Sequence, residues 1–162
     1  MFSLHHITIS SRDADVSIKF YERLGFKTVL QWSSVDKELR IVHMKLGAVL
    51  LEIFSYAHWQ EAPATTKSLD TDLPRVGIKH FGLKVADIKT TRDHMIGAGI
   101  ATNPEITEGR TGIKYFFIND PDGNWVEIVQ DAPKYGACDL YCPLFHRRAD
   151  PPPRVAEGRA VL

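Results

Sequence analysis

Two stretches of this chain can be laid over each other: "LHHITISSRDADVSIKFYERLGFKT" (residues 4–28) and "IKHFGLKVADIKTTRDHMIGAGIAT" (residues 78–102). A shift of 74 residues aligns three pairs: His6 with His80, Asp13 with Asp87, and Gly25 with Gly99. Residue identity is low, but apolar, polar and turn-forming positions follow in the same order. We therefore interpret the chain as an internal repeat.

Each repeat opens with a strand whose two faces differ. Apolar and polar residues alternate in "HITIS" (residues 6–10), and successive side chains of a strand point to opposite faces. The polar face carries His6, and the matching face of the second repeat carries His80. His5 falls on the apolar face, so we expect it to pack against the helix that follows.

A helix and three further strands follow in each repeat. Asp13 or Asp15 can cap the first helix, and Asp87 can cap the second. The predicted strands cover residues 26–33, 38–46 and 49–55 in the first repeat, and residues 101–107, 113–118 and 125–130 in the second. The sequence therefore predicts an α+β fold made of two βαβββ modules.

The predicted domain organisation follows from the repeats. A single domain spans residues 1–131, with repeats at about 4–56 and 78–131. The linker at residues 57–77 contains prolines and small polar residues, which favour a surface loop or a short helix. Residues 132–162 form a C-terminal tail outside the repeats.

The composition of the 162 residues limits the function. Twenty basic residues balance 20 acidic ones, so nothing favours binding to nucleic acid or to an anionic membrane surface. No apolar run is long enough to span a bilayer, and the N-terminus lacks the pattern of a signal peptide. The two cysteines, Cys138 and Cys142, are too few for a disulfide framework. We expect a cytoplasmic protein that binds a small molecule.

Each repeat ends with a glutamate in an apolar strand. Glu52 lies in "VLLEIFS" and Glu127 in "NWVEIVQ", 46 and 47 residues after the aligned histidines. A carboxylate between aliphatic neighbours is costly unless it is paired or bound to a metal. Each residue alone could be an ordinary polar strand residue, but the matched set of His6, Glu52, His80 and Glu127 predicts a divalent metal site. These nitrogen and oxygen ligands suit Zn, Ni, Co, Mn or Fe(II).

These motifs resemble those of the vicinal oxygen chelate superfamily, also known as the glyoxalase/bleomycin resistance/dioxygenase group. The resemblance rests on "HHITIS…FYERLGF", "VLLEIF", "IKHFGLKV" and "DPDGNWVEIVQ", and it covers residues 4–131. It implies two βαβββ modules that form a cupped, open barrel around a metal, with the four matched residues at the ligand positions of glyoxalase I. It also implies a homodimer, in which the site can be shared with two ligands from each chain.

The resemblance implies a lyase or isomerase of the glyoxalase I type, similar to lactoylglutathione lyase. That chemistry forms a metal-stabilised enediolate from a small carbonyl compound, with Glu127 as our first choice of base and Glu52 as its pseudosymmetric partner. Bacterial members of that type usually carry Arg and Asn at the positions of Ser10 and Tyr56, where they help to hold glutathione. Because this chain lacks both, the use of glutathione stays open, and another small carbonyl compound is a candidate substrate.

Two alternatives involve different chemistry. An extradiol-type dioxygenase would use His6, His80 and Glu127 as a triad of two histidines and one carboxylate, but Glu52 would then fill a position that substrate or oxygen needs. A small-molecule (antibiotic) binding resistance protein would usually lack the metal ligands, as bleomycin-binding members do. The complete set of four ligands favours the lyase or isomerase.

Overall fold

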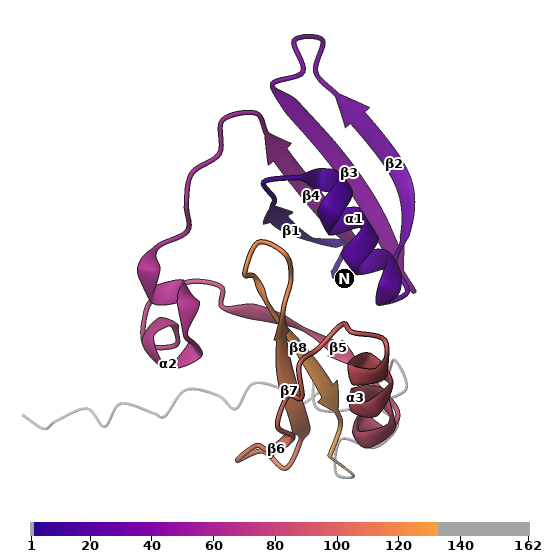
Figure 1. The fold of residues 1–162 in the computed structure, drawn as a ribbon, viewed down its shortest axis with the longest axis vertical. Coiled ribbons are helices and arrows are strands. Elements are labelled where there is room, and N and C mark those ends of the chain that lie inside the picture. Colours follow the sequence, from indigo (N-terminus) through magenta and orange to yellow (C-terminus); the bar gives the residue numbers. More distant parts are fainter. Residues whose placement is uncertain (1, 133–162) are drawn as a thin grey trace, which may run out of the picture. The chain divides into compact units, whose positions relative to one another are not determined.

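Residues 2–132 are described by the computed structural model, and Figure 1 shows how their elements are arranged. The first repeat contains β1 (His6–Ser10), α1 (Ala14–Arg23), β2 (Lys27–Ser33), β3 (Leu39–Leu46) and β4 (Val49–Tyr56). The linker contains η1 (Ala64–Lys67) and α2 (Leu69–Asp72). The second repeat contains β5 (His80–Lys84), α3 (Ile88–Gly97), β6 (Thr107–Glu108), β7 (Lys114–Asn119) and β8 (Trp125–Gln130). Cys138 and Cys142 lie outside the described residues, as does the predicted tail from residue 133 onward.

The two repeats form two four-stranded sheets with the same topology. The strand order is β1-β4-β3-β2 in the first sheet and β5-β8-β7-β6 in the second. In each sheet the opening strand runs parallel to the last strand, and the remaining neighbours are antiparallel. The predicted α+β fold of two βαβββ modules is therefore confirmed. No helix within residues 2–132 is both long enough and apolar enough to cross a membrane.

The helices begin and end where the sequence predicts. The Asp13 carboxylate accepts a hydrogen bond from the backbone N–H of Asp15 at 2.8 Å, and the Asp87 carboxylate accepts one from the N–H of Thr90 at 2.7 Å. Each bond satisfies a donor that the first turn of a helix leaves free. Beyond each helix a glycine adopts a positive φ, which lets the chain turn back toward the sheet.

One face of each sheet packs on its helix and forms the core. The buried apolar residues of the first module include Tyr21, Val42, Met44, Leu51 and Ile53. Those of the second module include Ile88, Met95, Phe116, Ile118, Val126 and Ile128. Since strand side chains alternate, this packing leaves the opposite face of each sheet to the polar residues, including the aligned His and Glu.

Two local expectations differ from the structure. A strand was expected over residues 101–107, but β6 contains only two residues because Pro104 lacks a donor and Asn103 adopts a φ of 45°. His5 was expected to pack against α1, but it precedes the strand and is exposed to solvent. The strand periodicity therefore does not apply to His5.

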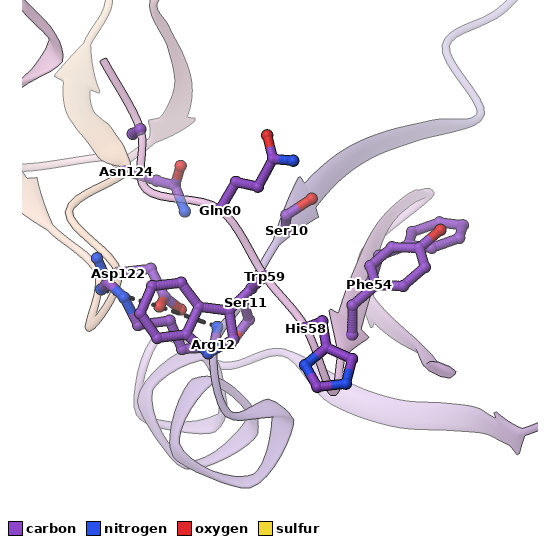
Figure 2. Close-up of a pocket in the computed structure, with 11 residues that line it drawn as sticks. Ser10, Ser11, Arg12, Phe54, His58, Trp59, Gln60, Asp122 and Asn124 are labelled. Carbon is purple, nitrogen blue, oxygen red and sulfur yellow. Dashed lines mark hydrogen bonds and ion pairs between the residues drawn. The ribbon is translucent and has the colours of Figure 1, made fainter. Parts of the chain in front are cut away.

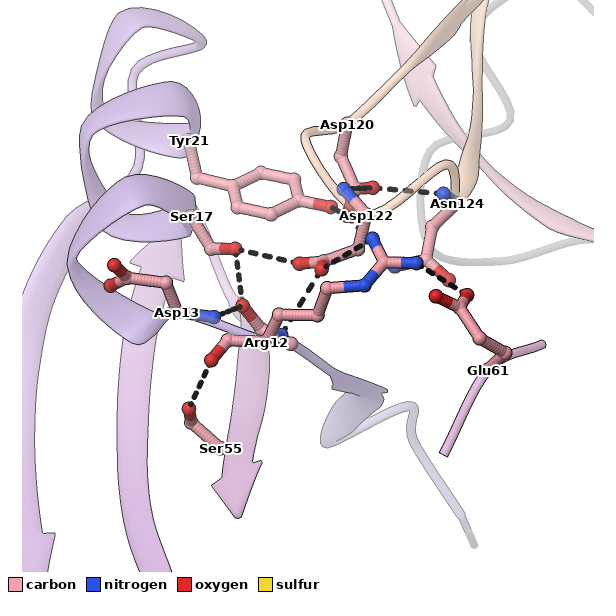
Figure 3. A network of polar contacts seen from close by, with 10 residues as sticks. Arg12, Asp13, Ser17, Tyr21, Ser55, Glu61, Asp120, Asp122 and Asn124 are labelled. Carbon is pink, nitrogen blue, oxygen red and sulfur yellow. Dashed lines mark hydrogen bonds and ion pairs between the residues drawn. The ribbon is translucent and has the colours of Figure 1, made fainter. Parts of the chain in front are cut away.

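A network of polar contacts joins the first module to the turn between β7 and β8 (Figure 3). The Tyr21 hydroxyl is fully buried and donates to the Asp120 carboxylate at 2.8 Å. Burial, and then the adjacent carboxylate, raise the pKa of the Tyr21 phenol. Arg12 forms an ion pair with Asp122 at 3.3 Å, and Ser17 also donates to this carboxylate. These contacts connect residues about a hundred positions apart in the chain.

Candidate functional site

The first His–Glu pair lies on the face of the first sheet opposite the core. β1 and β4 are adjacent and parallel, with Thr8 in register with Glu52. His6 is two residues before Thr8 and therefore lies on the same face. Its Nε2 atom is 3.8 Å from Glu52 Oε2, so the structure brings these two predicted residues together.

Both oxygens of the Glu52 carboxylate accept hydrogen bonds. Thr8 Oγ1 donates to Oε2 at 2.8 Å, and His43 Nε2 lies 2.9 Å from Oε1. Burial by itself would raise the pKa of Glu52, but the contacts with Thr8 and His43 outweigh it and hold this pKa below its usual value. The carboxylate is therefore ionised and fixed in direction, as a cation ligand requires.

Sequence reasoning missed His43 because the second repeat has no histidine at the matching position. The signal that could have found it is the register of the β3–β4 hairpin, which closes on the pair Leu46 and Val49. Counting three residues outward from that pair places His43 directly opposite Glu52. Residues directly opposite each other on adjacent strands share a face and interact.

The imidazole of His6 has a neighbour of its own. His5 Nδ1 lies 2.9 Å from His6 Nδ1, and the two rings meet edge to face. Nδ1 of the His6 ring takes part in this contact, and the other ring nitrogen, Nε2, faces Glu52. A hydrogen bond at one ring nitrogen orients the other toward a metal in many histidine sites.

The second His–Glu pair occupies the equivalent position in the second sheet. His80 Nε2 lies 3.5 Å from Glu127 Oε2. Within residues 2–132 no hydrogen bond reaches the Glu127 carboxylate, and the buried Nδ1 of His80 has no partner. Gly82 is in register with Glu127, and a Cβ atom at Gly82 would lie 3.4 Å from its Oε2. A glycine at this position offers the carboxylate no side-chain hydrogen-bond donor.

The structure forms two separate pairs and does not gather all four residues within one chain. In the described part of the chain, no group of three or more His, Cys, Asp or Glu side chains is arranged to hold a metal ion. Each pair lies on the sheet face opposite the core and is partly exposed: 46% and 20% for the side chains of His6 and Glu52, and 29% and 15% for those of His80 and Glu127. Leu30 and Trp32 of β2 share the face of the first pair, and each is about half exposed.

Comparison with known proteins places the chain in a family. The profile described as Glyoxalase/Bleomycin resistance protein/Dioxygenase superfamily matches residues 3–128. The uncharacterized protein YwbC of Bacillus subtilis (strain 168) is 31% identical over 135 residues, which cover 78% of this chain and 96% of YwbC. A lactoylglutathione lyase of Pseudomonas putida is 26% identical over 152 residues, covering 82% of this chain and 87% of that enzyme.

A solved structure agrees with these matches. The crystal structure of a glyoxalase family protein from Enterococcus faecalis superposes with a TM-score of 0.64 and 26% sequence identity. The superposition covers 78% of this chain and 96% of that protein. Since the profile matches well over half of the chain, including both His–Glu pairs, this chain belongs to the glyoxalase/bleomycin resistance protein/dioxygenase superfamily.

Proposed function

We propose that this protein is a metal-dependent lyase or isomerase that acts on a small carbonyl compound, with its site shared between two copies of the chain. His6 and Glu52 of one copy would meet His80 and Glu127 of the other. The observation that carries the proposal is the matched pair of His–Glu contacts, each on the face of its own sheet opposite the core. The resemblance of the family motifs to those of glyoxalase I, which forms homodimers, supports the same arrangement.

The donor atoms fit a divalent metal ion. Metal–donor distances of about 2.0–2.2 Å place adjacent donors roughly 3.0 Å apart around an octahedral ion and roughly 3.4 Å apart around a tetrahedral one. The two His–Glu separations are 3.8 and 3.5 Å, close to these values and too long for a hydrogen bond. Each pair supplies two ligands, so four protein ligands require both pairs.

The open faces of the sheets suit a second copy. Trp32 is about half exposed on the face that carries the first pair. On the second sheet, Phe117 and Trp125 flank Glu127 and meet edge to face with ring centroids 6.0 Å apart. Covering these aromatic residues would bury apolar surface at about 25 cal/mol per Å². Closing one sheet over the other would also bring the two His–Glu pairs to a common ion.

The two glutamates are suited to different roles. A bound divalent ion would polarise a carbonyl oxygen and acidify the neighbouring C–H bond. Glu127 accepts no hydrogen bond from residues 2–132, so its carboxylate is free to take that proton and return it to the adjacent carbon. Glu52 is fixed by Thr8 and His43 and would remain a ligand.

The proposal is tested by metal content together with proton exchange. We expect about one divalent ion per chain, and deuterium incorporation from D2O next to the carbonyl of hydroxyacetone or of a hemithioacetal, assayed with and without glutathione. His80→Ala should lose both the metal and the exchange. His94→Ala is the control, because His94 is an exposed histidine on α3 away from both pairs. Full metal content in His80→Ala would refute the proposal.

One observation favours extradiol-type ring cleavage as a second candidate. Thr8 and His43 each use one lone pair of the Glu52 carboxylate, and if Glu52 keeps only these partners the ligands reduce to His6, His80 and Glu127. Two histidines and one carboxylate leave positions open for a catechol and for oxygen on Fe(II). Oxygen uptake with catechol and Fe(II) that survives Glu52→Gln would select this candidate over the lyase or isomerase.

A further inference from the structure

A cavity of about 510 Å³ opens at the carboxyl ends of β1 and β4 (Figure 2). Its lining includes Ser10, Arg12, Phe54, Tyr56, Trp59 and Asn124. This volume is in the range of small-molecule sites. Neither the His–Glu pairs nor the proposed proton transfer uses these residues, so the cavity needs an explanation of its own.

The cavity adjoins the first His–Glu pair along the same sheet face. Phe54 and Tyr56 follow Glu52 on β4 at steps of two residues, so all three side chains point to one face. A rise of about 3.3 Å per residue places Phe54 about 7 Å beyond Glu52. Ser10 follows Thr8 on β1 in the same way. A substrate whose carbonyl lies beside Glu52 would therefore extend into this cavity.

Aromatic rings form the walls of the cavity. The rings of Phe54 and Tyr56 are stacked, with centroids 6.3 Å apart and an angle of 20° between their planes. In Figure 2, Trp59 lies near Arg12, on the side away from Phe54. The centroid of the Trp59 ring is 4.9 Å from the Arg12 guanidinium carbon. Tyr56 and Trp59 are each nearly half exposed, so their rings are accessible to a ligand. Stacked or edge-on aromatic pairs contribute about 0.5–1.5 kcal/mol beyond area burial.

The charged side chains of the cavity are already paired. The Arg12 guanidinium contacts Glu61 at 2.6 Å and Asp122 at 3.3 Å, so two carboxylates face its single positive charge. His58 lies 3.9 Å from Glu38. Among the described residues that line the cavity there is no other basic side chain. A substrate carboxylate or phosphate would therefore find no free cation here, and Glu61 and Asp122 would repel it.

We infer that this cavity is a specificity subsite for a neutral, planar aromatic group of the substrate, which Phe54, Tyr56 and Trp59 would contact. The inference rests on the proposed function, because it takes the carbonyl end of the same molecule to lie at the His6 and Glu52 pair. The substrate class is then an aryl α-hydroxy or α-keto carbonyl compound. In the ketol case the C–H bond of the hydroxyl-bearing carbon breaks and Glu127 takes the proton. The hydroxyl proton passes to the former carbonyl oxygen, and Glu127 returns its proton to the former carbonyl carbon, so the ketone becomes an α-hydroxy aldehyde.

The subsite is tested by comparing two ketols that differ in the ring. 2-Hydroxyacetophenone carries a phenyl group, and hydroxyacetone carries a methyl group in its place. Binding to the full-length, metal-free protein is measured by ligand-observed NMR and tryptophan fluorescence. We expect the phenyl compound to bind at least tenfold more tightly. Phe54→Ala and Tyr56→Ala should each remove most of this preference, and Tyr56→Phe should keep it. Val16→Ala is the control, since Val16 is as exposed as Tyr56 but lies on α1 outside the cavity.

A charged analogue and an exchange assay complete the experiment. 4-(2-Hydroxyacetyl)benzoate keeps the ring and adds a carboxylate, so it should bind at least tenfold more weakly than 2-hydroxyacetophenone. Equal binding of the two ketols, or tighter binding of the benzoate, would overturn the subsite. Should Phe54→Ala fail to fold, Trp59→Phe and Tyr56→Ala provide the same comparison. Selective phenyl binding without deuterium exchange in the metal-loaded protein would instead refute the proposed function and leave the aromatic subsite standing.

Discussion

The two His–Glu pairs have the same strand framework but different surroundings. In the first pair, His5 contacts the ring of His6, and both Thr8 and His43 hydrogen-bond to Glu52. In the second pair, neither ring nitrogen of His80 has a hydrogen-bond partner among residues 2–132, and the Glu127 carboxylate accepts no hydrogen bond there. The fold repeats the His and Glu of each pair but not the groups that orient them.

The difference lies in two matched positions. Thr8 corresponds to Gly82, and the two residues are in register with Glu52 and Glu127 respectively. His43 corresponds to Phe117, which is directly opposite Glu127 and meets the His80 ring edge to face at 5.0 Å. A donor in the first pair is thus replaced by empty space or by an aromatic edge in the second. We interpret the first pair as the fixed ligands and the second as the pair that takes part in proton transfer.

The largest expected effect concerns the two glutamates. Glu127→Gln should lower the deuterium exchange rate of a ketol by about 10²–10⁴-fold, the usual contribution of a general base. Metal should remain bound, because the amide oxygen can still act as a ligand. Glu52→Gln keeps an amide oxygen as a ligand in the same way, but Glu52 is not the base, so this variant should lower the exchange rate less than Glu127→Gln does. Equal losses of rate in the two variants would show that the two glutamates do not differ in role.

A smaller effect is expected from removing a supporting group. His43→Phe gives the first pair the residue that the second pair has at this position. Loss of an outer hydrogen bond of this kind weakens metal binding by about 10–100-fold, measured by competition with a chelator. His94→Phe makes the same substitution on α3 and should leave metal affinity unchanged. Unchanged metal affinity in His43→Phe would show that the contact between His43 and Glu52 does not support metal binding.

The converse substitution adds a hydrogen-bond donor to the second pair. Gly82→Thr should place a hydroxyl beside Glu127, as Thr8 does beside Glu52, and there is space for its Cβ at ordinary contact distance. A new hydrogen bond of about 1 kcal/mol to the base should slow the exchange rate by about five- to tenfold. Gly82→Ala has the same Cβ without the hydroxyl. If both variants lose activity equally, the space at Gly82 matters and the missing hydrogen bond does not.

The smallest effect concerns the contact between the modules. Tyr21 aligns with Met95, so the buried hydroxyl that reaches Asp120 also lacks a counterpart in the second repeat. Tyr21→Phe should lower the free energy of unfolding by about 1 kcal/mol, the net contribution of one hydrogen bond. Urea denaturation measures this change. Tyr115→Phe should have no effect, because no hydrogen bond joins the Tyr115 hydroxyl to any described residue. Equal stability of Tyr21→Phe and the wild type would contradict the role assigned to this contact.

Most of the fold could be predicted from the sequence because both repeats carry the same local signals. Strand alternation, an aspartate before each helix and a glycine after it all agree, so the elements match within one or two residues at most ends. The prediction fails where a single residue outweighs the pattern. Pro104 shortens β6, and His5 lies just outside the strand whose period was applied to it.

The candidate site could be predicted only in part. The repeat identifies His6 with Glu52 and His80 with Glu127, because each pair comes from the adjacent parallel strands of one module. It cannot find His43, whose position depends on hairpin register and not on the repeat. It also cannot find the cavity, because Trp59 and Arg12 reach it from the linker and from the loop before α1.

The central claim is that the two pairs meet across two chains, and heterodimers of two variants test it directly. His6→Ala and His80→Ala chains are co-expressed with different tags, and the mixed dimer is isolated by two successive affinity steps. If the site is shared, one of its two sites has all four ligands and the other lacks both histidines. A shared site predicts about one tightly bound divalent ion per mixed dimer and none in either parent protein. A mixed dimer without metal, or metal retained in both parents, would contradict it.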